Sequence, residues 1–432
     1  MRKAALHNLG CKVNAYETEA MTQLLSESGY EIVPFSEKAD VYIVNTCSVT
    51  NIADRKSRQM LHRARKLNPD AVVVATGCYA QTATEKIAED ASIDLIVGNN
   101  KKKDIVNLLA DFFEEKAEKT NVIDINHTDE YEQLEIFSVT EHTRADLKIQ
   151  DGCNSFCTYC IIPYARGRIR SRKVVHIIEE VERLAKKGFQ EVVLTGINLS
   201  CYEDEGKTLI DVIETINEID GIARIRLGSL DPEVITEDFT KRLAKVEKIC
   251  PHFHLSMQSG CDKTLMAMNR HYTSQEFYEI CERLRRYFKQ PALTTDVIVG
   301  FPQETEEDFE TTKRFVEKVG FAELHVFKYS RRDGTVAAKM QGQVDEQVKN
   351  RRSEILIETG KKLTKEFHER IKGTAVEVLF EETVEIQGKS YAVGHTKDYV
   401  KIAVETLEIL DGKIRQVTVT DGLNNEIMLA TL

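Results

Sequence analysis

The sequence predicts a multidomain α/β protein built from three folded parts, and three observations support this class. The chain has 432 residues, which is more than one ordinary domain holds. Short β-branched runs alternate with helical patterns over most of the chain, as in parallel α/β folds. After residue 372 short strands separated by Gly and Asp indicate a small all-β module.

The first part, residues 1–115, is expected to contain a mainly parallel sheet. Residues 41–45, 71–75 and 95–97 are apolar runs beside turn residues, as buried strands are. Helical patterns alternate with them, at residues 16–28, 52–67 and 82–90. The acidic stretch that follows, residues 116–140, is predicted to be a linker.

The second part, residues 141–371, repeats a strand–helix unit six times. Strands are expected at residues 147–150, 191–194, 224–227, 252–255, 294–299 and 323–327. The helices between them are expected at residues 174–187, 209–218, 232–246, 274–288 and 306–319. Six such units predict a partial, TIM-like parallel barrel, (βα)6. A long charged helix at residues 346–371 leads to the all-β module, residues 372–432.

Charge and apolar content narrow the function classes. The chain carries 59 Lys and Arg against 70 Asp and Glu, a net charge of −11, which by itself disfavours a nucleic-acid partner. No apolar run approaches the roughly 20 residues that span a bilayer, and the N-terminus lacks a signal-peptide pattern. We therefore expect a cytoplasmic protein without a membrane partner, whose ten cysteines stay reduced and serve metal binding or chemistry.

The charge is unevenly placed along the chain. Residues 111–141 contain ten acids against two Lys, and residues 373–432 contain ten acids against five basic residues. Two windows, residues 55–66 and 162–173, are basic and contain no acid. Such a run is often only a solvated helix face, so a second observation is needed to assign it to phosphate binding.

Cys153, Cys157 and Cys160 form a C-x3-C-x2-C pattern, CNSFCTYC, at the end of the first predicted barrel strand. Three thiolates cannot complete a tetrahedral zinc site, and no further Cys or His follows closely. A cubane iron–sulfur cluster normally takes four protein ligands. Three cysteines therefore predict a cluster with one iron open to a substrate or cofactor.

Three more cysteines, Cys11, Cys47 and Cys78, each follow a predicted strand of the first part. The carboxyl ends of neighbouring parallel strands meet at one edge of a sheet, so these thiols could form a second metal site. Cysteine is also a common small core residue, which leaves a structural role open. The four other cysteines show no paired spacing and are expected to be structural: Cys201, Cys250, Cys261 and Cys281.

At this point the sequence resembles the radical S-adenosylmethionine methylthiotransferase family over almost its whole length. The similar blocks occur in order: GCKVNAYETEA, NTCSVT, TGCYAQ, DGCNSFCTYCIIPYARGRIRSR, LTGINL, RIRLGSLDPE, HFHLSMQSG, MNRHYT, TDVIVGFPQETEEDF and FKYSRRDGT. The resemblance implies an N-terminal methylthiotransferase domain, a radical S-adenosylmethionine barrel and a C-terminal RNA-binding TRAM barrel. One block departs from the family pattern, because Gln303 stands where Gly usually follows the Pro of FPQET.

The branches of this family differ at readable positions. GCKVN, the Ile in RGRIRSR and HFHLSMQSGCD resemble the branch that acts on N6-threonylcarbamoyladenosine at position 37 of tRNA. The branch for isopentenyladenosine has GCQMN, and the branch that modifies a ribosomal-protein aspartate has GCPKN. These two remain as alternative substrates. An RNA-binding protein with only structural or redox-sensing clusters is the alternative from another class, and the intact CNSFCTYC motif disfavours it.

The resemblance implies two [4Fe-4S] clusters and S-adenosylmethionine, with chemistry at the clusters and no acid–base catalytic residue. Cys153, Cys157 and Cys160 would hold the cluster that cleaves S-adenosylmethionine, with the aromatic Tyr159 beside it. Cys11, Cys47 and Cys78 would hold an auxiliary cluster that presents sulfur. One S-adenosylmethionine would methylate that sulfur, and a second would supply the radical that removes hydrogen from C2 of the adenine. An electron donor such as flavodoxin or ferredoxin is implied, and we expect a monomer.

The remaining expectations concern S-adenosylmethionine and tRNA. Residues expected at or just beyond the ends of barrel strands are candidates for cofactor contacts: Thr195, Gly196, Ser229, Gln258 and Asp296. Both basic windows lie close after a cysteine of a triplet, which favours phosphate contacts from Arg55, Arg58, Arg63, Arg166, Arg168, Arg170 and Arg172. In the TRAM-like module we expect Lys397 and Lys401 to contact RNA, on one face with Lys389, Lys413 and Arg415.

Overall fold

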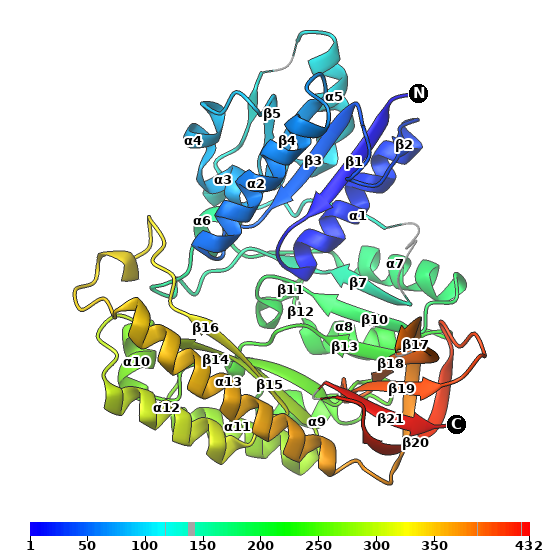
Figure 1. Ribbon diagram of the computed structural model, residues 1–432, viewed down its shortest axis with the longest axis vertical. Helices are drawn as coiled ribbons and strands as arrows, with labels where there is room; N and C mark the ends of the chain where they lie inside the picture. The colour runs from blue at the N-terminus through cyan, green and yellow to red at the C-terminus, as the bar shows by residue number, and fades with distance from the viewer. Residues whose placement is uncertain (117, 137–142, 387, 425) are drawn as a thin grey trace.

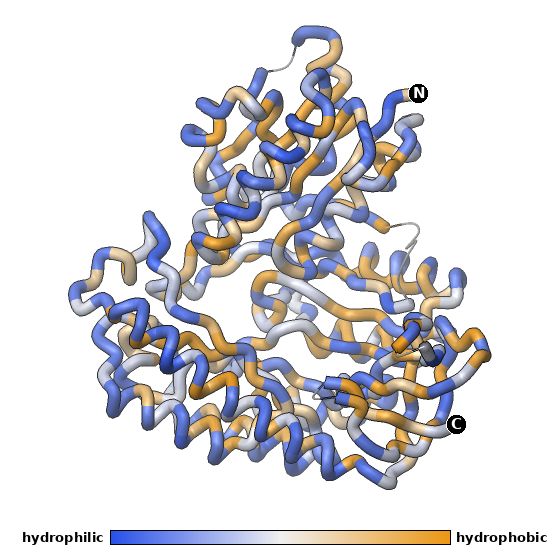
Figure 2. Tube along the Cα trace, viewed as in Figure 1, coloured by the Kyte–Doolittle hydropathy of each residue, from blue (hydrophilic) through white to orange (hydrophobic). Residues whose placement is uncertain are grey.

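The computed structural model describes residues 1–432 except residues 117, 137–142, 387 and 425. Figure 1 shows three parts: an N-terminal α/β domain at the top, a half-open barrel below it, and a small β barrel beside the half-open barrel. Apolar segments run along the strands inside each part, while the helices show alternating apolar and polar segments (Figure 2). No helix in the described ranges is long and apolar enough to cross a membrane.

The N-terminal domain is built on a six-stranded parallel sheet with the order β2-β1-β3-β4-β5-β6. Its strands are β1 (Lys3–Asn8), β2 (Glu31–Ile32), β3 (Val41–Thr46), β4 (Val72–Gly77), β5 (Leu95–Val97) and β6 (Thr120–Asn121). One face packs against α1 (Lys12–Glu27) and α5 (Ile105–Phe113). The other face packs against α2 (Asn51–Leu67), α3 (Cys78–Thr82) and α4 (Thr84–Ala88). Both faces are covered, which explains why the strands are continuous apolar runs.

The half-open barrel consists of two three-stranded parallel sheets, β13-β10-β7 and β14-β15-β16. Its strands are β7 (Arg144–Lys148), β10 (Glu191–Thr195), β13 (Arg224–Leu227), β14 (His252–Gln258), β15 (Ala292–Val299) and β16 (Glu323–Lys328). The main helices are α7 (Val174–Lys186), α8 (Leu209–Asn217), α9 (Glu237–Leu243), α11 (Ser274–Tyr287), α12 (Glu306–Val319) and α13 (Glu346–Glu369). The expected partial (βα)6 barrel is therefore confirmed, with β7 and β16 as its edges.

Shorter elements connect these units. The cysteine loop lies between β8 (Gln150–Asp151) and α6 (Ile162–Arg166), and β9 (Arg170–Ser171) pairs with β8. The others are β11 (Glu203–Asp204), β12 (Lys207–Thr208), α10 (Asp262–Ala267) and five 3-10 turns: Lys102–Asp104, Ile125–His127, Leu199–Cys201, Pro232–Val234 and Ala337–Lys339. The helix predicted at residues 232–246 is thus split into a 3-10 turn and α9.

The C-terminal module is a closed barrel with the strand order β17-β18-β19-β21-β20. Its strands are β17 (Ala375–Ile386), β18 (Lys389–Thr396), β19 (Lys401–Glu405), β20 (Ile414–Gly422) and β21 (Ile427–Thr431). Two buried arginines of β13 attach it to the half-open barrel. Arg224 donates to the main-chain oxygens of Glu377 and His395, and Arg226 donates to those of Thr396 and Lys397.

The prediction of a linker at residues 116–140 is wrong for much of that segment. Thr120–Asn121 form β6 and extend the N-terminal sheet beyond residue 115. Leu134 and Ile136 are buried in the core of the half-open barrel. Because acidic residues dominate this segment, its few buried apolar residues did not stand out in the sequence. Residues 117 and 137–142 lie outside the described part of the chain.

Candidate active site

Cys11, Cys47 and Cys78 meet at one edge of the N-terminal sheet. They directly precede α1, follow β3 and begin α3, and the strands before them, β1, β3 and β4, are neighbours. Burial raises the pKa of the Cys47 thiol to about 11, and the neighbouring thiols of Cys78 and Cys11 add to the effect. Cys47 and Cys78 are buried and Cys11 is exposed, so the group opens to solvent on the Cys11 side.

Close packing explains the glycine before Cys11. Gly10 has φ +106°, and a Cβ atom on it would lie 2.9 Å from both Cβ and Sγ of Cys47. A side chain at this position would therefore push two of the three cysteines apart. Gly10 therefore allows Cys47 to pack against the chain segment that carries Cys11.

Arg166 joins this cysteine group to the half-open barrel. Its Nε lies 3.4 Å from Sγ of Cys78, and its two terminal nitrogens donate to Glu17 and Asn14 of α1. It also pairs with Asp151, at 3.2 Å. Arg166 ends α6, a helix of five residues that begins just after Cys160 and contacts α3. A helix of that length spans roughly 8 Å, so the two cysteine triplets approach each other across this arginine.

The buried charges around Arg166 carry a positive surplus. The interacting groups are three acids and four bases: Glu17, Glu132 and Asp151 against Lys102, Lys148, Arg166 and Arg170. Burial raises the pKa of Glu132, which enlarges the surplus when that carboxyl is protonated. Buried charges need compensation. Three thiolates holding an iron–sulfur cluster would supply it, so the donor set and its surroundings fit that group.

Cys153, Cys157 and Cys160 lie on one loop of the half-open barrel, between β8 and α6. Several N–H groups point at their sulfur atoms. The main-chain N–H of Ser155 and the side-chain amide of Asn198 lie 3.4 and 3.8 Å from Sγ of Cys153. Arg270 lies 3.5 Å from Sγ of Cys157. Such donors stabilise sulfur that carries negative charge, so this triplet fits a cluster as well.

Tyr159 and the Thr195–Gly196 turn shape this second site. The ring of Tyr159 packs edge-on against Phe301, 6.5 Å between centroids. Gly196 follows β10, and a Cβ atom there would lie 2.9 Å from the side-chain oxygen of Gln150. That same oxygen accepts a hydrogen bond from the N–H of Asn198 at 2.7 Å. The turn after β10 is thus tied to the start of the cysteine loop, where the glycine makes room.

Of the other three predicted cofactor contacts, two lie at the ends of barrel strands and one does not. Ser229 is exposed just beyond β13, and Gln258 ends β14 with φ +69°, a left-handed backbone conformation. Both lie at the carboxyl ends of strands, as expected. Asp296 does not, because β15 continues to Val299 and Asp296 lies in its middle. The prediction that Asp296 lies at a strand end is therefore wrong.

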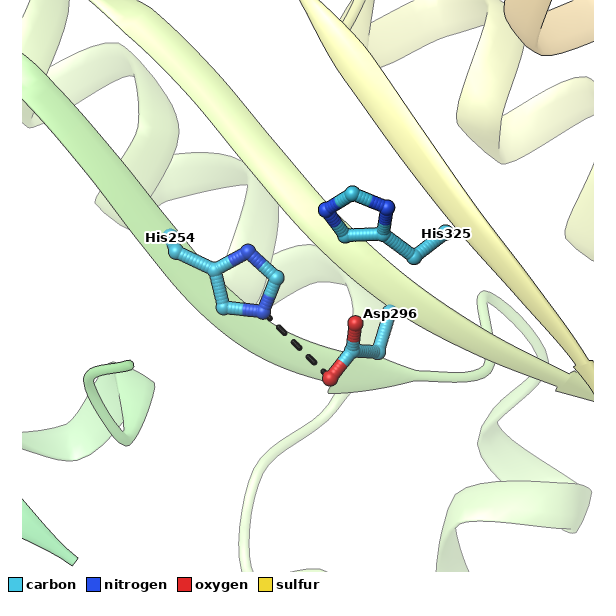
Figure 3. A group of neighbouring side chains, drawn as sticks. All are labelled: His254, Asp296 and His325. Carbon is cyan, nitrogen blue, oxygen red and sulfur yellow. Dashed lines mark ion pairs between the residues drawn. The ribbon is translucent and has the colours of Figure 1, made fainter. Parts of the chain in front are cut away.

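Asp296 instead forms a group with His254 and His325 inside the half-open barrel (Figure 3). Its carboxylate lies 3.3 Å from Nε2 of His254, whose Nδ1 pairs with Thr294 at 3.0 Å. The ligand atoms of the three residues all lie within 4.8 Å of one another, close enough to share a metal ion. The His254–Asp296 ion pair already satisfies two of the three groups, so no ion is needed to explain them.

Several of the arginines predicted to bind phosphate are buried, which corrects that prediction. Arg166, Arg170 and Arg172 have exposed fractions of 0%, 3% and 0%. Arg166 and Arg170 pair with Asp151, and Arg172 pairs with Glu180. The sequence showed the run of basic residues, but it did not show that acidic residues outside the run bind them. Of that window Arg168 is the arginine left partly exposed.

The basic window at residues 55–66 lies on α2 and presents part of its charge to solvent. Arg55 and Arg63 are exposed. Arg58 is partly buried, and it donates to the hydroxyl of Tyr79 at 3.0 Å. Of the arginines predicted to bind phosphate in this window, Arg55 and Arg63 are therefore the exposed ones.

The C-terminal barrel does not gather its basic residues as predicted. In the antiparallel pair β18–β19, His395 is opposite Lys401 and Tyr391 is opposite Glu405, which puts Lys389 and Lys401 at opposite ends. Lys389 pairs with Glu405 at 2.8 Å, and Lys401 lies 3.5 Å from Glu382. Lys397 is partly buried, with its main-chain oxygen bound to Arg226. The prediction of a single basic face is wrong for this strand pair.

Two arginines that no sequence pattern singled out contact the site. Arg270, in the block MNRHYT, binds Asp231 and the main chain of Ser256 besides approaching Cys157. Arg332, in FKYSRRDGT, reaches the N-terminal domain and binds Asp54 and Ser48, next to Cys47. Both blocks were visible as motifs. Their partners lie far away in the chain, so no local spacing showed them.

Comparison with known proteins decides the family. The first part, residues 3–98, matches the model of uncharacterized protein family UPF0004, and residues 147–316 match that of the radical SAM superfamily. The chain is 41% identical over 425 residues to threonylcarbamoyladenosine tRNA methylthiotransferase MtaB of Bacillus subtilis, covering 97% of this chain and 94% of that protein. The chain belongs to the radical S-adenosylmethionine methylthiotransferase family. As a member it is an enzyme that uses S-adenosylmethionine and two [4Fe-4S] clusters.

Other relatives in this methylthiotransferase family differ in substrate. The MtaB protein of Aquifex aeolicus is 40% identical, covering 90% of this chain and 95% of that protein. The tRNA-2-methylthio-N(6)-dimethylallyladenosine synthase of Acetivibrio thermocellus is 35% identical, covering 96% and 88%. Among solved structures, the radical S-adenosylmethionine methyltransferase TsrM of Kitasatospora setae has a TM-score of 0.58 at 16% identity, covering 76% of this chain and 73% of that chain, which shows a shared fold.

Proposed function

We propose that this methylthiotransferase acts on tRNA and converts N6-threonylcarbamoyladenosine at position 37 into its 2-methylthio derivative. The observation that carries the proposal is the pair of cysteine triplets, on two domains, joined through Arg166. The substrate rests on relatives named as MtaB proteins at 36–41% identity over at least 90% of the chain. The blocks GCKVN and HFHLSMQSGCD support the same branch.

In this proposal Cys153, Cys157 and Cys160 hold one cluster, and Cys11, Cys47 and Cys78 hold the other. The first would supply the electron that cleaves S-adenosylmethionine to methionine and a 5′-deoxyadenosyl radical, and the second would supply sulfur. The aromatic C2–H of adenine offers no proton acidic enough for base catalysis, which is why a radical is required.

The chain's own residues position these groups. Arg270 and Asn198 donate toward the sulfur atoms of the first triplet, and Arg166 and Asn99 toward that of Cys78. Arg166 is buried and tied to Glu17 and Asp151, so the two domains have little freedom to separate at this point. A fixed spacing is what two sites acting on one carbon need.

Exposed side chains beside the first triplet support an RNA-binding surface. Phe156 and Tyr164 are 36% and 42% exposed, with their rings 6.0 Å apart and edge to face. The guanidinium of Arg168 lies 4.5 Å from the ring centroid of Phe156. Exposed aromatics with a neighbouring arginine suit unpaired bases of an RNA loop. With Arg55 and Arg63 of α2 they form the proposed tRNA contact.

The test is an anaerobic assay of the reconstituted full-length enzyme with S-adenosylmethionine and flavodoxin or dithionite as electron donor. Two tRNAs are offered together, one with N6-threonylcarbamoyladenosine and one with N6-dimethylallyladenosine at position 37. Mass spectrometry of the nucleosides should show 2-methylthio-N6-threonylcarbamoyladenosine in large excess. Preferential modification of the dimethylallyl nucleoside would assign the enzyme to the other tRNA branch, and modification of neither would overturn the proposal.

A further inference from the structure

A cavity of about 810 Å³ opens between the N-terminal domain, the edge strand of the half-open barrel and the C-terminal barrel. Its lining includes Lys12 and Tyr16 of α1, Arg144 of β7, Val193 of β10 and Tyr399 of the C-terminal barrel. The volume is within the range of small-ligand sites. Because Lys12 directly follows Cys11, the cavity begins next to the first cysteine group.

Most charged groups that line this cavity already have partners, inside or outside the lining. Glu381 pairs with Arg144 and His395, and Glu382 lies near Lys401. Glu19 and Asp146 have interactions of their own. The ammonium group of Lys12 is different, since it makes no hydrogen bond or ion pair with any residue that the structure describes. An exposed cation on a cavity wall is available to an anionic ligand.

The surroundings of Lys12 add to its positive potential. Lys12 is the first residue of α1, a helix of 16 residues, where the helix dipole is positive. On the barrel side, the pKa of His252 is lowered by burial and by the positive charges of Arg226, His254, Lys12 and His325. The positive charge of Lys12 therefore acts on His252, in the same direction as the charges of His254 and His325. The carboxylate of Asp296 is paired with His254.

We propose that Lys12 binds the carboxylate of the threonylcarbamoyl group and so determines which modified adenosine the enzyme accepts. This inference rests on the proposed function. The threonylcarbamoyl group carries a carboxylate, whereas the dimethylallyl group is a hydrocarbon with no charge. A charge-assisted hydrogen bond from Lys12 would favour the first substrate only.

The experiment compares Lys12→Gln with the wild-type enzyme on two forms of one tRNA, with either N6-threonylcarbamoyladenosine or plain adenosine at position 37. Binding is measured by anaerobic titration of the reconstituted enzyme. The variant should bind the threonylcarbamoyl form roughly 10- to 100-fold more weakly, as expected for loss of a hydrogen bond to a charged group. Its affinity for the plain form, its iron content and its cleavage of S-adenosylmethionine without tRNA should not change.

Two further variants sharpen the outcome. Lys12→Arg keeps the charge and should retain part of the preference, and Lys289→Gln, an exposed lysine before β15, is the matched control. Equal weakening of both tRNA forms by Lys12→Gln would assign Lys12 to a phosphate and overturn the proposal, as would no effect on either. If wild type makes no 2-methylthio-N6-threonylcarbamoyladenosine, the proposed function fails instead, and the two failures are thereby distinguished.

Discussion

At the scale of single residues, Arg166 is the clearest case of a side chain whose role depends on burial. The basic window around it resembled a phosphate-binding run, yet its guanidinium is completely buried and contacts both domains. The partners explain why sequence could not show this, because Glu17 lies 149 positions away from Arg166. The sequence showed that the window is basic. Only the fold showed which residues the charge of Arg166 contacts.

Replacing Arg166 by Leu should destabilise the protein. The change leaves Glu17 and Asp151 with one fewer buried partner, and breaking a buried ion pair typically costs about 3–5 kcal/mol. Urea unfolding of the cluster-free protein under anaerobic conditions measures the difference. Arg55→Leu, at an exposed position of α2, should change the free energy of unfolding by less than about 0.5 kcal/mol. Equal stability of the two variants would refute the structural role of Arg166.

Gln303 shows how a departure from the family pattern is accommodated. The family usually has Gly here, and Gln303 keeps the left-handed conformation that Gly favours, with φ +67°. Its main-chain N–H binds the oxygen of Gly342 at 2.8 Å. A non-glycine residue in this region costs roughly 1–2 kcal/mol, while glycine loses roughly 0.5–1 kcal/mol of additional conformational entropy.

Gln303→Gly is therefore expected to stabilise the protein slightly, by about 0–1 kcal/mol. Thermal or urea unfolding detects the change, with Gln290→Gly as a control at another described left-handed position, φ +51°. A loss of more than about 1 kcal/mol in the Gln303→Gly variant would show that the side chain stabilises this turn.

At the scale of elements, the proposed function gives the loop from β8 to α6 both a cofactor role and a substrate role. Its cysteines face the N–H donors described above, and Phe156 is held outward with φ +46° by contacts of Asn269 to the main chain of Ser155 and Phe156. The triplet spacing was readable from sequence. The outward direction of Phe156 was not, because it depends on a backbone conformation fixed by a residue 113 positions away.

Phe156→Ala should weaken binding of the tRNA anticodon stem-loop. Loss of one base–aromatic stack typically costs about 1–3 kcal/mol, or roughly 5- to 150-fold in Kd. Fluorescence titration under anaerobic conditions checks this, with iron content measured in parallel to show that the cysteine loop is intact. Ile357→Ala, at an exposed position on α13, is the control and should bind normally. Unchanged affinity of the Phe156→Ala variant would exclude the aromatic pair from the RNA contact.

At the scale of the whole molecule, the fold was largely predictable because the strand and helix patterns of α/β proteins are local. The six strand–helix units, the parallel N-terminal sheet and the all-β module were all expected and are confirmed. What could not be predicted is how the parts join. Arg166, Arg332, Arg224 and Arg226 make those connections through buried polar contacts, and such pairs leave no periodic signal in the sequence.

Net charge was also a poor guide at this scale. The acidic excess of −11 suggested no nucleic-acid partner, and part of the basic charge that seemed to offset it is buried in structural ion pairs. The proposed RNA surface instead depends on a few exposed groups beside the two cysteine triplets. Placement and exposure of charge, rather than its sum, therefore support the assignment.

We infer that two clusters on two domains perform separate parts of one reaction. The most direct test measures iron, 5′-deoxyadenosine and 2-methylthio-N6-threonylcarbamoyladenosine in anaerobically reconstituted wild type, Cys47→Ala and Cys157→Ala. Wild type should bind about eight irons and form both products. Cys47→Ala should keep about four irons and form only 5′-deoxyadenosine, and Cys157→Ala should form neither product. Methylthiolated nucleoside from the Cys47→Ala variant, at the rate of wild type, would contradict this division of roles between the two clusters.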